Sequence, residues 1–265
     1  EIGVRLVGSE MCIRDRGNVA TITLNRPEKL NAINDEMIQD IFECLWRIEN
    51  DDDVWVAVLA GNGRAFCTGH DLVMSGGDKA DPVPGAPTGT TDDLYVYLSN
   101  LSKPIIAAPH GYALAQGSGL ALLCDFRIAS DDAQFGWPQV KRGIASISGP
   151  TILTQYVPFG YALMMLMTGE FITAEEGHRV GLVQEIVPRD KQMDRVYEVA
   201  NMITQNAPLA VRTIKKAAVT GRAIPDFAER VKNSSALAKT IKDSEDTKEG
   251  LKAFAEKRVP TFKGR

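Results

Sequence analysis

The sequence predicts an α/β domain followed by a purely helical C-terminal region. Between residue 17 and about residue 130, short strand-like segments alternate with helical patterns across Gly- and Pro-containing turns, which is typical of layered α/β domains. After Asp190 the apolar residues recur only at helical spacing,. We therefore expect an α/β core over residues 17–200 and a helical region over residues 201–265.

The first core elements follow from their local patterns. Apolar and polar residues alternate over residues 19–24, which predicts a half-buried strand that ends before Pro27,. Asn34 is a suitable N-cap for a helix over residues 35–49, whose first turn is acidic as the helix dipole favours,. A buried strand is expected over residues 54–60.

The remaining elements are predicted in the same way. A Gly-, Pro- and Asp-rich loop from Ser75 to Thr91 is longer than ordinary connectors, as in lids and binding loops,. The elements expected after it are a helix at 92–101, a strand at 104–109, an apolar helix ending near Cys124, a strand at 126–129, and tail helices at 193–205, 208–220, 224–240 and 243–257.

Composition excludes several classes of protein. The net charge is −4 and the pI is near 5.5, so we expect no nucleic-acid partner,. The longest apolar runs are far shorter than the roughly 20 residues that span a bilayer, and no secretory signal pattern opens the chain,. We therefore predict no membrane partner.

Cysteine and histidine usage gives no metal or disulfide framework. Four cysteines lie far apart without a Cys-x-x-Cys pair, which favours a reducing cytoplasm,. None of the three histidines neighbours another ligand at metal-binding spacing,. We predict no metal and no redox cofactor.

Residues 1–16 fit poorly with the rest of the chain. They end in a charged run, Arg14-Asp15-Arg16, and resemble translated adapter read-through. Ile2–Val7 could pair as an edge strand, but the segment is left out of the functional argument.

Two glycine-containing segments carry the chemistry, Arg64–Leu72 and Gly111–Leu120. The second is a small-residue turn that opens an apolar helix, and such an N-terminus offers unpaired N–H groups to an anion. A further N–H from the first segment would complete an oxyanion hole. Alternatively, the glycines only permit close packing of helix and strand.

Together with their neighbours these segments resemble the enoyl-CoA hydratase/isomerase (crotonase) family. The matching pieces are Leu24–Ala32, Phe66–Leu72, Lys103–Gly111, Cys124–Ala129, Phe135-Gly136, Thr168-Gly169 and Gly181–Val183. The resemblance covers the chain from Gly17 onward. It implies a spiral of ββα units and a helical C-terminal region that builds homotrimers or dimers of trimers. Its substrate would be an acyl-CoA thioester.

The resemblance also implies the roles of individual residues. The backbone N–H groups of His70 and Gln116 would form the oxyanion hole. The residues expected to bind the substrate are Lys29, Leu30, Ala32, Thr68, Gly69, Asp71 and Leu72, with Phe254 and Lys257 reaching the nucleotide end from a neighbouring subunit. Apart from the resemblance, Trp137 beside Gln139 could form an apolar wall of the acyl pocket, or only fill the core,.

The chain departs from the family where the hydratases carry two glutamates. Gly119 and Gln139 stand at those positions, and Gln139 cannot take up a proton,. Neither residues 94–124 nor residues 135–169 contain any Asp or Glu. Because general acid–base catalysis contributes roughly 10²–10⁴-fold, ordinary hydration should be crippled.

Other side chains could substitute, and each has a structural alternative. His70 titrates in a useful range but can point outward. Asp92 and Asp93 could reach the pocket, or simply begin a helix. His110 suits an anchoring role. Ser118 lacks the Gly-x-Ser-x-Gly elbow of a nucleophilic serine,.

Two classes of function therefore stay open. The first is a CoA-thioester enzyme that isomerises, hydrolyses, or adds a water held near Gln139. The second is a non-catalytic acyl-CoA-binding protein. RNA binding, which is known in the family, is disfavoured by the acidic balance.

Overall fold

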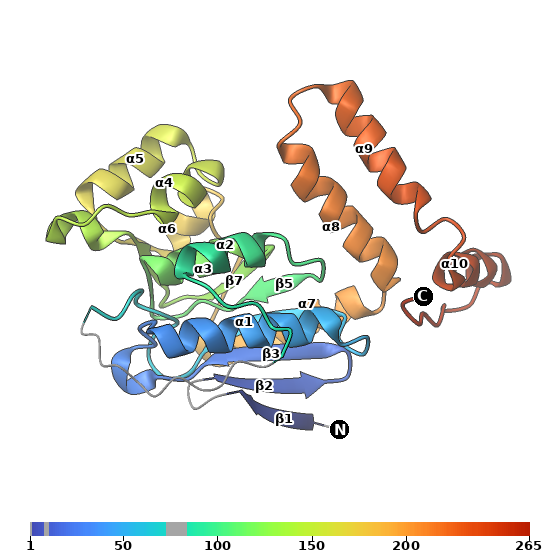
Figure 1. Cartoon of the computed structure of the whole chain (residues 1–265), viewed down its shortest axis with the longest axis horizontal. Helices are drawn as coiled ribbons and strands as arrows, with labels where there is room; N and C mark the ends of the chain where they lie inside the picture. The colour runs from blue at the N-terminus through green and yellow to red at the C-terminus, as the bar shows by residue number, and fades with distance from the viewer. Residues whose placement is uncertain (1, 8–10, 73–83) are drawn as a thin grey trace.

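The computed structural model describes residues 2–7, 11–72 and 84–265. Within these residues, the larger sheet has seven strands (Figure 1). In sheet order they are β1 (Ile2–Val7), β2 (Met11–Arg16), β3 (Val19–Leu24), β4 (Val56–Gly61), β5 (Ile105–Ala107), β7 (Phe126–Ser130) and β10 (Glu185–Val187). The first three strands pair antiparallel, and β3 to β10 pair parallel. Ile2–Val7 is thus the edge strand, and the strand at Met11–Arg16 was not predicted.

A second, small sheet gives the fold its spiral character. It contains β6 (Tyr112–Leu114), β8 (Gln134–Gly136) and β9 (Ile172–Thr173), with β6 parallel to β8 and β8 antiparallel to β9. The chain alternates between the sheets, from β5 to β6, then through α3 (Gln116–Leu123) to β7, and on to β8. This repetition confirms the predicted ββα spiral.

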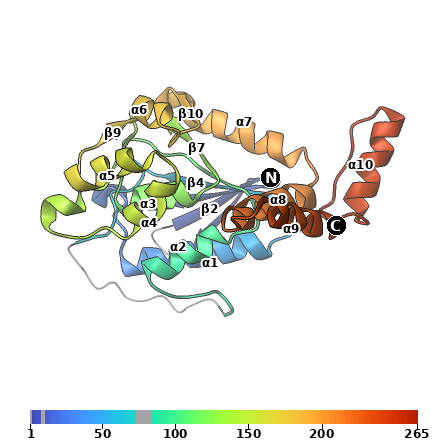
Figure 2. The same cartoon turned by 90° about the horizontal axis from the view of Figure 1, so that it is seen from above.

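Helices cover both faces of the large sheet (Figure 2). α1 (Asp35–Asn50) and α2 (Thr91–Ser99) pack with α3 on one face, and α7 (Gln192–Thr204) covers the other. The prediction that the strand at 19–24 is half-buried is therefore wrong. α7 covers its second face, where the Thr21 hydroxyl lies 3.0 Å from the Tyr197 hydroxyl.

The helix starts follow the capping chemistry expected from the sequence. Asn34 accepts a hydrogen bond from the Met37 N–H at the start of α1,. At the start of α2, Thr90 and Asp93 form a reciprocal capping box, which assigns Asp93 a structural role,. The predicted loop from Ser75 to Thr91 lies partly outside the described residues, which resume at Pro84.

The remaining helices complete the chain. They are α4 (Ser148–Ile152), α5 (Phe159–Thr168), α6 (Ala174–Arg179), α8 (Pro208–Arg222), α9 (Phe227–Lys239) and α10 (Glu245–Glu256), with 3₁₀ turns at Pro27–Lys29, Pro138–Arg142, Leu153–Gln155 and Arg189–Lys191. Residue 200, which the sequence predicts as the boundary of the core, lies inside α7. Val196 and Ala200 of this helix are buried in the same cluster as residues of the large sheet. α8, α9 and α10 project away from the body (Figures 1 and 2).

No helix in the described ranges is both long enough and apolar enough to cross a membrane.

His110, between β5 and β6, is buried and should make folding pH-dependent. Burial and, to a smaller extent, nearby Arg189 lower its pKa from 6.5 to about 4, although Asp132 opposes the shift. The unfolded chain therefore binds more protons than the folded one between these values, so stability falls as pH drops from 6.5 to 4,. The loss should approach about 3 kcal/mol.

Urea unfolding at pH 7 and pH 4.5 checks this. His110→Gln should lose less stability than the wild type over that interval. Equal losses in the two proteins would contradict the assignment.

Candidate active site

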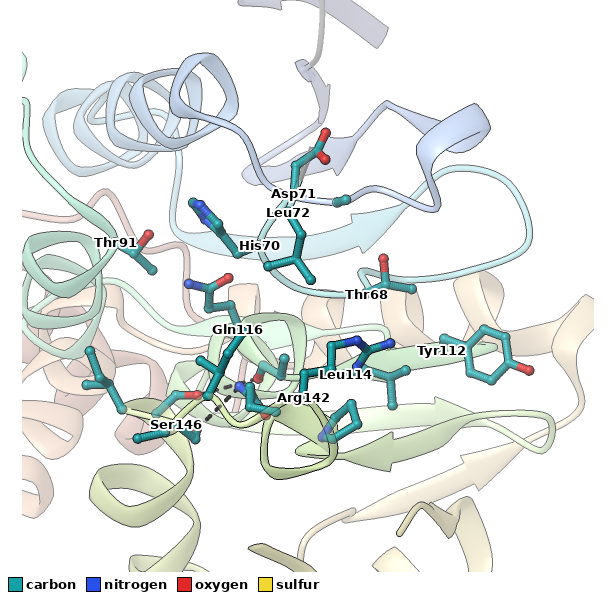
Figure 3. Close-up of a pocket in the computed structure, with 18 of the residues that line it drawn as sticks. Thr68, His70, Asp71, Leu72, Thr91, Tyr112, Leu114, Gln116, Arg142 and Ser146 are labelled. Carbon is teal, nitrogen blue, oxygen red and sulfur yellow. Dashed lines mark hydrogen bonds between the residues drawn. The ribbon is translucent and has the colours of Figure 1, made fainter. Parts of the chain in front are cut away.

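A cavity of about 1000 Å³ opens beside the start of α3 (Figure 3). This volume is at the upper end of small-molecule sites. The lining comes from the loop after β4, the starts of α2 and α3, and the segment from Pro138 to Ser148. The described residues that line it are Leu30, Ala32, Thr68, His70, Asp71, Leu72, Thr90, Thr91, Asp92, Tyr95, Tyr112, Leu114, Ala115, Gln116, Pro138, Gln139, Lys141, Arg142, Ile144, Ala145, Ser146, Ile147, Ser148 and Phe171.

The loops at the cavity are held together by the buried amide of Asn31. Its Oδ1 accepts from the Arg26 N–H at 2.8 Å. Its Nδ2 lies 2.9 Å from the Asn62 carbonyl, 2.8 Å from that of Ala65 and 3.1 Å from that of Phe66. The Asn31 backbone has a φ of +55°, which Asn tolerates better than most residues,.

Backbone hydrogen bonds then fix the segment that carries His70. The Thr68 N–H donates to Leu30 at 3.2 Å, the Ile33 N–H to Gly69 at 2.7 Å, and the Asp71 N–H to Ile33 at 2.8 Å. Backbone hydrogen bonds therefore join residues 68–71 to residues 30–33 on both sides of His70.

Two glycines allow this segment to contact the start of α3. A Cβ at Gly117 would lie 2.2 Å from the Cys67 carbonyl oxygen. A Cβ at Gly69, whose φ is +97°, would lie 2.7 Å from the Ala115 Cβ and 3.3 Å from the Gln116 nitrogen. Side chains at these two positions would push the segments apart.

The approach brings the segment that carries His70 against the start of α3, where the Gln116 nitrogen would lie 3.3 Å from a Cβ at Gly69. Within the described part of the chain, neither the His70 N–H nor the Gln116 N–H donates a hydrogen bond to a protein acceptor. Ala115, the N-cap of α3, has a φ of +53° and a ψ of −116°, a strained conformation held by its own N–H bond to Gly136,. Such a pair of N–H groups at a helix start can stabilise a developing oxyanion.

The side chains of His70 and Asp71, next to these N–H groups, have different surroundings. The His70 side chain is exposed at the cavity mouth. The Asp71 carboxylate lies 3.3 Å from the Arg26 guanidinium, so it serves as an ion-pair partner within the loop framework. Figure 3 shows Asp71 directed away from Gln116 and Ser146.

Neutral polar groups occupy the region where the sequence placed the missing glutamates. Gln139 lines the cavity and donates from Nε2 to the Ser146 hydroxyl at 3.4 Å. A Cβ at Gly119 would lie 3.1 Å from the Tyr95 hydroxyl and 2.8 Å from the Ser148 Cβ. Sequence reasoning missed Tyr95 and Ser148, because Tyr95 shares the helical spacing of buried core residues.

One predicted role needs correction. Trp137 does not line the cavity, because its ring is fully packed in the core and only 1% exposed. Its Nε1–H instead donates to the Ser148 hydroxyl at 3.1 Å. Ser118 is buried and donates to the Ala113 carbonyl, a structural contact.

The other predicted site residues divide into two groups. Those that line the cavity are Leu30, Ala32, Thr68, His70, Asp71, Leu72, Gln116 and Gln139. Those that do not line it are Lys29, Gly69, Gly119, Phe254 and Lys257. Gly69 and Gly119 lie outside the lining, but their lack of a side chain allows close contact with Ala115 and with Ser148, respectively. Phe254 and Lys257 lie at α10, in the projecting helical region (Figure 1).

A profile of the enoyl-CoA hydratase/isomerase family matches residues 14–265, nearly the whole chain. The chain belongs to the enoyl-CoA hydratase/isomerase family. Membership confirms the resemblance seen in the sequence and makes the protein an acyl-CoA enzyme of the crotonase type.

Similar proteins in this family include several hydratases. The chain is 41% identical to an (E)-benzylidenesuccinyl-CoA hydratase of Thauera aromatica, over 93% of this chain and 96% of that protein. It is 34% identical to a 2,3-dehydroadipyl-CoA hydratase of Escherichia coli, over 97% and 100%. The crystal structure of an enoyl-CoA hydratase from Mycobacterium marinum superposes with a TM-score of 0.85 at 33% identity, over 97% of this chain and 99% of that one.

Gly69→Ala tests the contact that brings the two N–H groups together. The added methyl would collide with Ala115 and strain the backbone, so acyl-CoA turnover should fall about 10²-fold, as when one oxyanion donor is lost,. Gly160→Ala in α5 is the matched control, because no atom lies within 4 Å of a Cβ there. Equal turnover in the two variants would rule out the role of this contact.

Proposed function

We propose that the protein adds water to the α,β double bond of an acyl-CoA thioester, or removes it in the reverse direction. The observation that carries this proposal is that the N–H groups of His70 and Gln116, which line the cavity, donate no hydrogen bond within the described residues. The thioester oxygen would accept both hydrogen bonds, and the enolate formed during addition would bind them more strongly than the ground state does.

Water addition is favoured over isomerisation and thioester hydrolysis. The relatives named above are hydratases, and the chain spans nearly their full length. The side-chain oxygens of Gln116 and Gln139 are buried at the cavity with no hydrogen-bond partner in the described structure. Such acceptors suit a bound water, which needs polar partners.

A non-catalytic acyl-CoA-binding role is the second candidate. The described lining contains no glutamate, and its two aspartates are Asp71, paired with Arg26, and the exposed Asp92. A protein that kept the pocket but lost proton transfer would have this composition.

The acyl-CoA would occupy the cavity along its apolar wall. Leu30 and Ala32 line one side, and the exposed side chains of Leu72, Ile144 and Ile147 line the cavity elsewhere. Phe254 and Lys257 would contact the nucleotide end in a neighbouring copy, because α10 projects from the body of its own chain.

We further propose that the helical region joins copies of the chain into a homotrimer or a dimer of trimers. Large apolar side chains are exposed on the projecting helices and the chain after them: Ile214, Val219, Phe227, Val231, Leu251, Phe254 and Val259. Exposed apolar area of this kind marks contact surfaces between proteins.

A cytoplasmic location is proposed on the state of the thiols. Cys67 and Cys124 are buried free thiols. Burial raises the pKa of the Cys67 and Cys124 thiols to about 12, which keeps them unreactive,. Unpaired buried thiols suit a reducing compartment.

The hydratase proposal is tested with crotonyl-CoA and (E)-benzylidenesuccinyl-CoA. Mass spectrometry should detect the adduct of one water with at least one thioester, and a parallel titration should show CoA binding. Binding without adduct would support the second candidate. Failure of both in folded protein would remove the acyl-CoA assignment.

Light scattering tests the assembly proposal. On a size-exclusion column coupled to light scattering, the wild type should have the mass of three or six chains. Phe227→Glu should shift it toward the monomer, because Phe227 is 76% exposed in the single chain and a buried charge is costly,. Met167→Glu on α5 is the control, and an unchanged mass for Phe227→Glu would exclude this helix from the interface.

A further inference from the structure

We propose that the hydroxyl of Tyr95, supported by Ser148, is the proton-transferring group of this site. The pair takes the place of the glutamate that the family carries at the position of Gly119. The inference rests on the proposed hydratase function and names the residue that performs its proton transfer.

The placement of Tyr95 carries the argument. Tyr95 comes from α2, lines the cavity and is only 8% exposed. Its hydroxyl lies 3.1 Å from the point where a Cβ at Gly119 would stand, so it fills the space that a side chain there would use. The hydroxyl is buried, and no hydrogen bond of good geometry satisfies it within the described structure. A buried phenol is costly to leave unpaired, so a ligand or water is expected to complete it.

Ser148 is held in place next to this phenol. Its hydroxyl accepts from the Trp137 Nε1–H at 3.1 Å and donates to the Ala115 carbonyl at 3.5 Å. Burial raises the pKa of the Tyr95 phenol, and the nearby Ser148 hydroxyl offsets this only in part. Tyr95 therefore carries its proton at neutral pH and acts as a donor.

The two glutamine oxygens define where the water would sit. Oε1 of Gln116 and Oε1 of Gln139 are buried acceptors without partners among the described residues, and both residues line the same cavity as Tyr95. A water that donates to these oxygens would present its lone pair to the substrate.

The proton balance of the step closes without a carboxylate. The water oxygen forms a bond to Cβ of the substrate as the Cα–Cβ double bond breaks. The π electron pair of that double bond moves through Cα to the thioester oxygen, which the His70 and Gln116 N–H groups would bind. The electrons then return to Cα, which takes the phenolic proton of Tyr95. The oxygen now bonded to Cβ gives its extra proton to the Tyr95 oxygen, directly or through Ser148. The product gains one H and one OH, and Tyr95 ends unchanged.

This route should proceed without a free phenolate, because burial disfavours the charged form of Tyr95,. Loss of one proton from the phenol and gain of another must therefore be closely coupled. Water and Tyr95 would act together, as the paired carboxylates do in the hydratases that this chain resembles.

Tyr95→Phe is the decisive variant, because it removes one oxygen and keeps the ring. The kcat for hydration should fall at least about 10²-fold, while the Kd for the acyl-CoA stays within about two-fold. Tyr97→Phe is the matched control: Tyr97 lies on the same helix, packs against Phe42 with ring centroids 5.8 Å apart, and does not line the cavity. Ser148→Ala should lower kcat by a smaller factor.

The outcomes separate the two proposals. If the wild type hydrates a thioester and Tyr95→Phe does so equally well, this inference fails and the hydratase function stands. If kcat, acyl-CoA affinity and thermal stability fall together in Tyr95→Phe, the hydroxyl is structural and the inference is overturned. If the folded wild type hydrates neither crotonyl-CoA nor (E)-benzylidenesuccinyl-CoA, both proposals fail.

Discussion

The geometry of the site depends on the buried amide of Asn31. One side chain accepts from the Arg26 N–H, and its Nδ2, with two hydrogens to donate, lies within 3.1 Å of three backbone carbonyls between Asn62 and Phe66,. Those groups lie on loops that sheet pairing alone leaves unconnected, and each would be costly to bury unpaired. Because the loops are fixed there, residues 68–71 can lie against α3 with little freedom. The backbone of this segment is therefore positioned by the fold itself, as the proposed oxyanion hole requires of its donors.

The polar groups near Gly119 and at Gln139, where the family resemblance places two glutamates, are neutral, which changes the energetics of that part of the pocket. A carboxylate in a dry cavity carries a large desolvation cost unless it is paired. Hydroxyls and amides such as Ser148 and Gln139 cost less to bury but transfer protons less readily. If the proposed function holds, the site combines two N–H donors for the thioester oxygen with weak acids and bases around them. The proposed water addition would then have to couple bond formation at Cβ to proton movement.

Much of the fold could be predicted from the sequence, and the site only in part. Local signals were sufficient for α1 and its Asn34 cap, and the glycine segments identified the contact at Gly69. The burial of both faces of β3 could not be foreseen, because the covering helix, α7, comes about 170 residues later in the chain. Trp137 was placed at the cavity wall because apolar spacing does not distinguish a wall from the layer behind it. Tyr95 was missed for the same reason: its helical spacing is that of a core residue, and only the fold shows that it lines the cavity.

The crowding at Gly119 also bears on how such a site can change over generations. A glutamate introduced at that position would meet crowding, because its Cβ would lie 2.8 Å from the Ser148 Cβ and 3.1 Å from the Tyr95 hydroxyl. Relieving this crowding would call for a smaller residue at one or both neighbours. Changing either position first leaves a clash or an unfilled cavity, each of which lowers stability. Packing therefore couples position 119 to its two neighbours, so a carboxylate there would have to arise together with compensating substitutions.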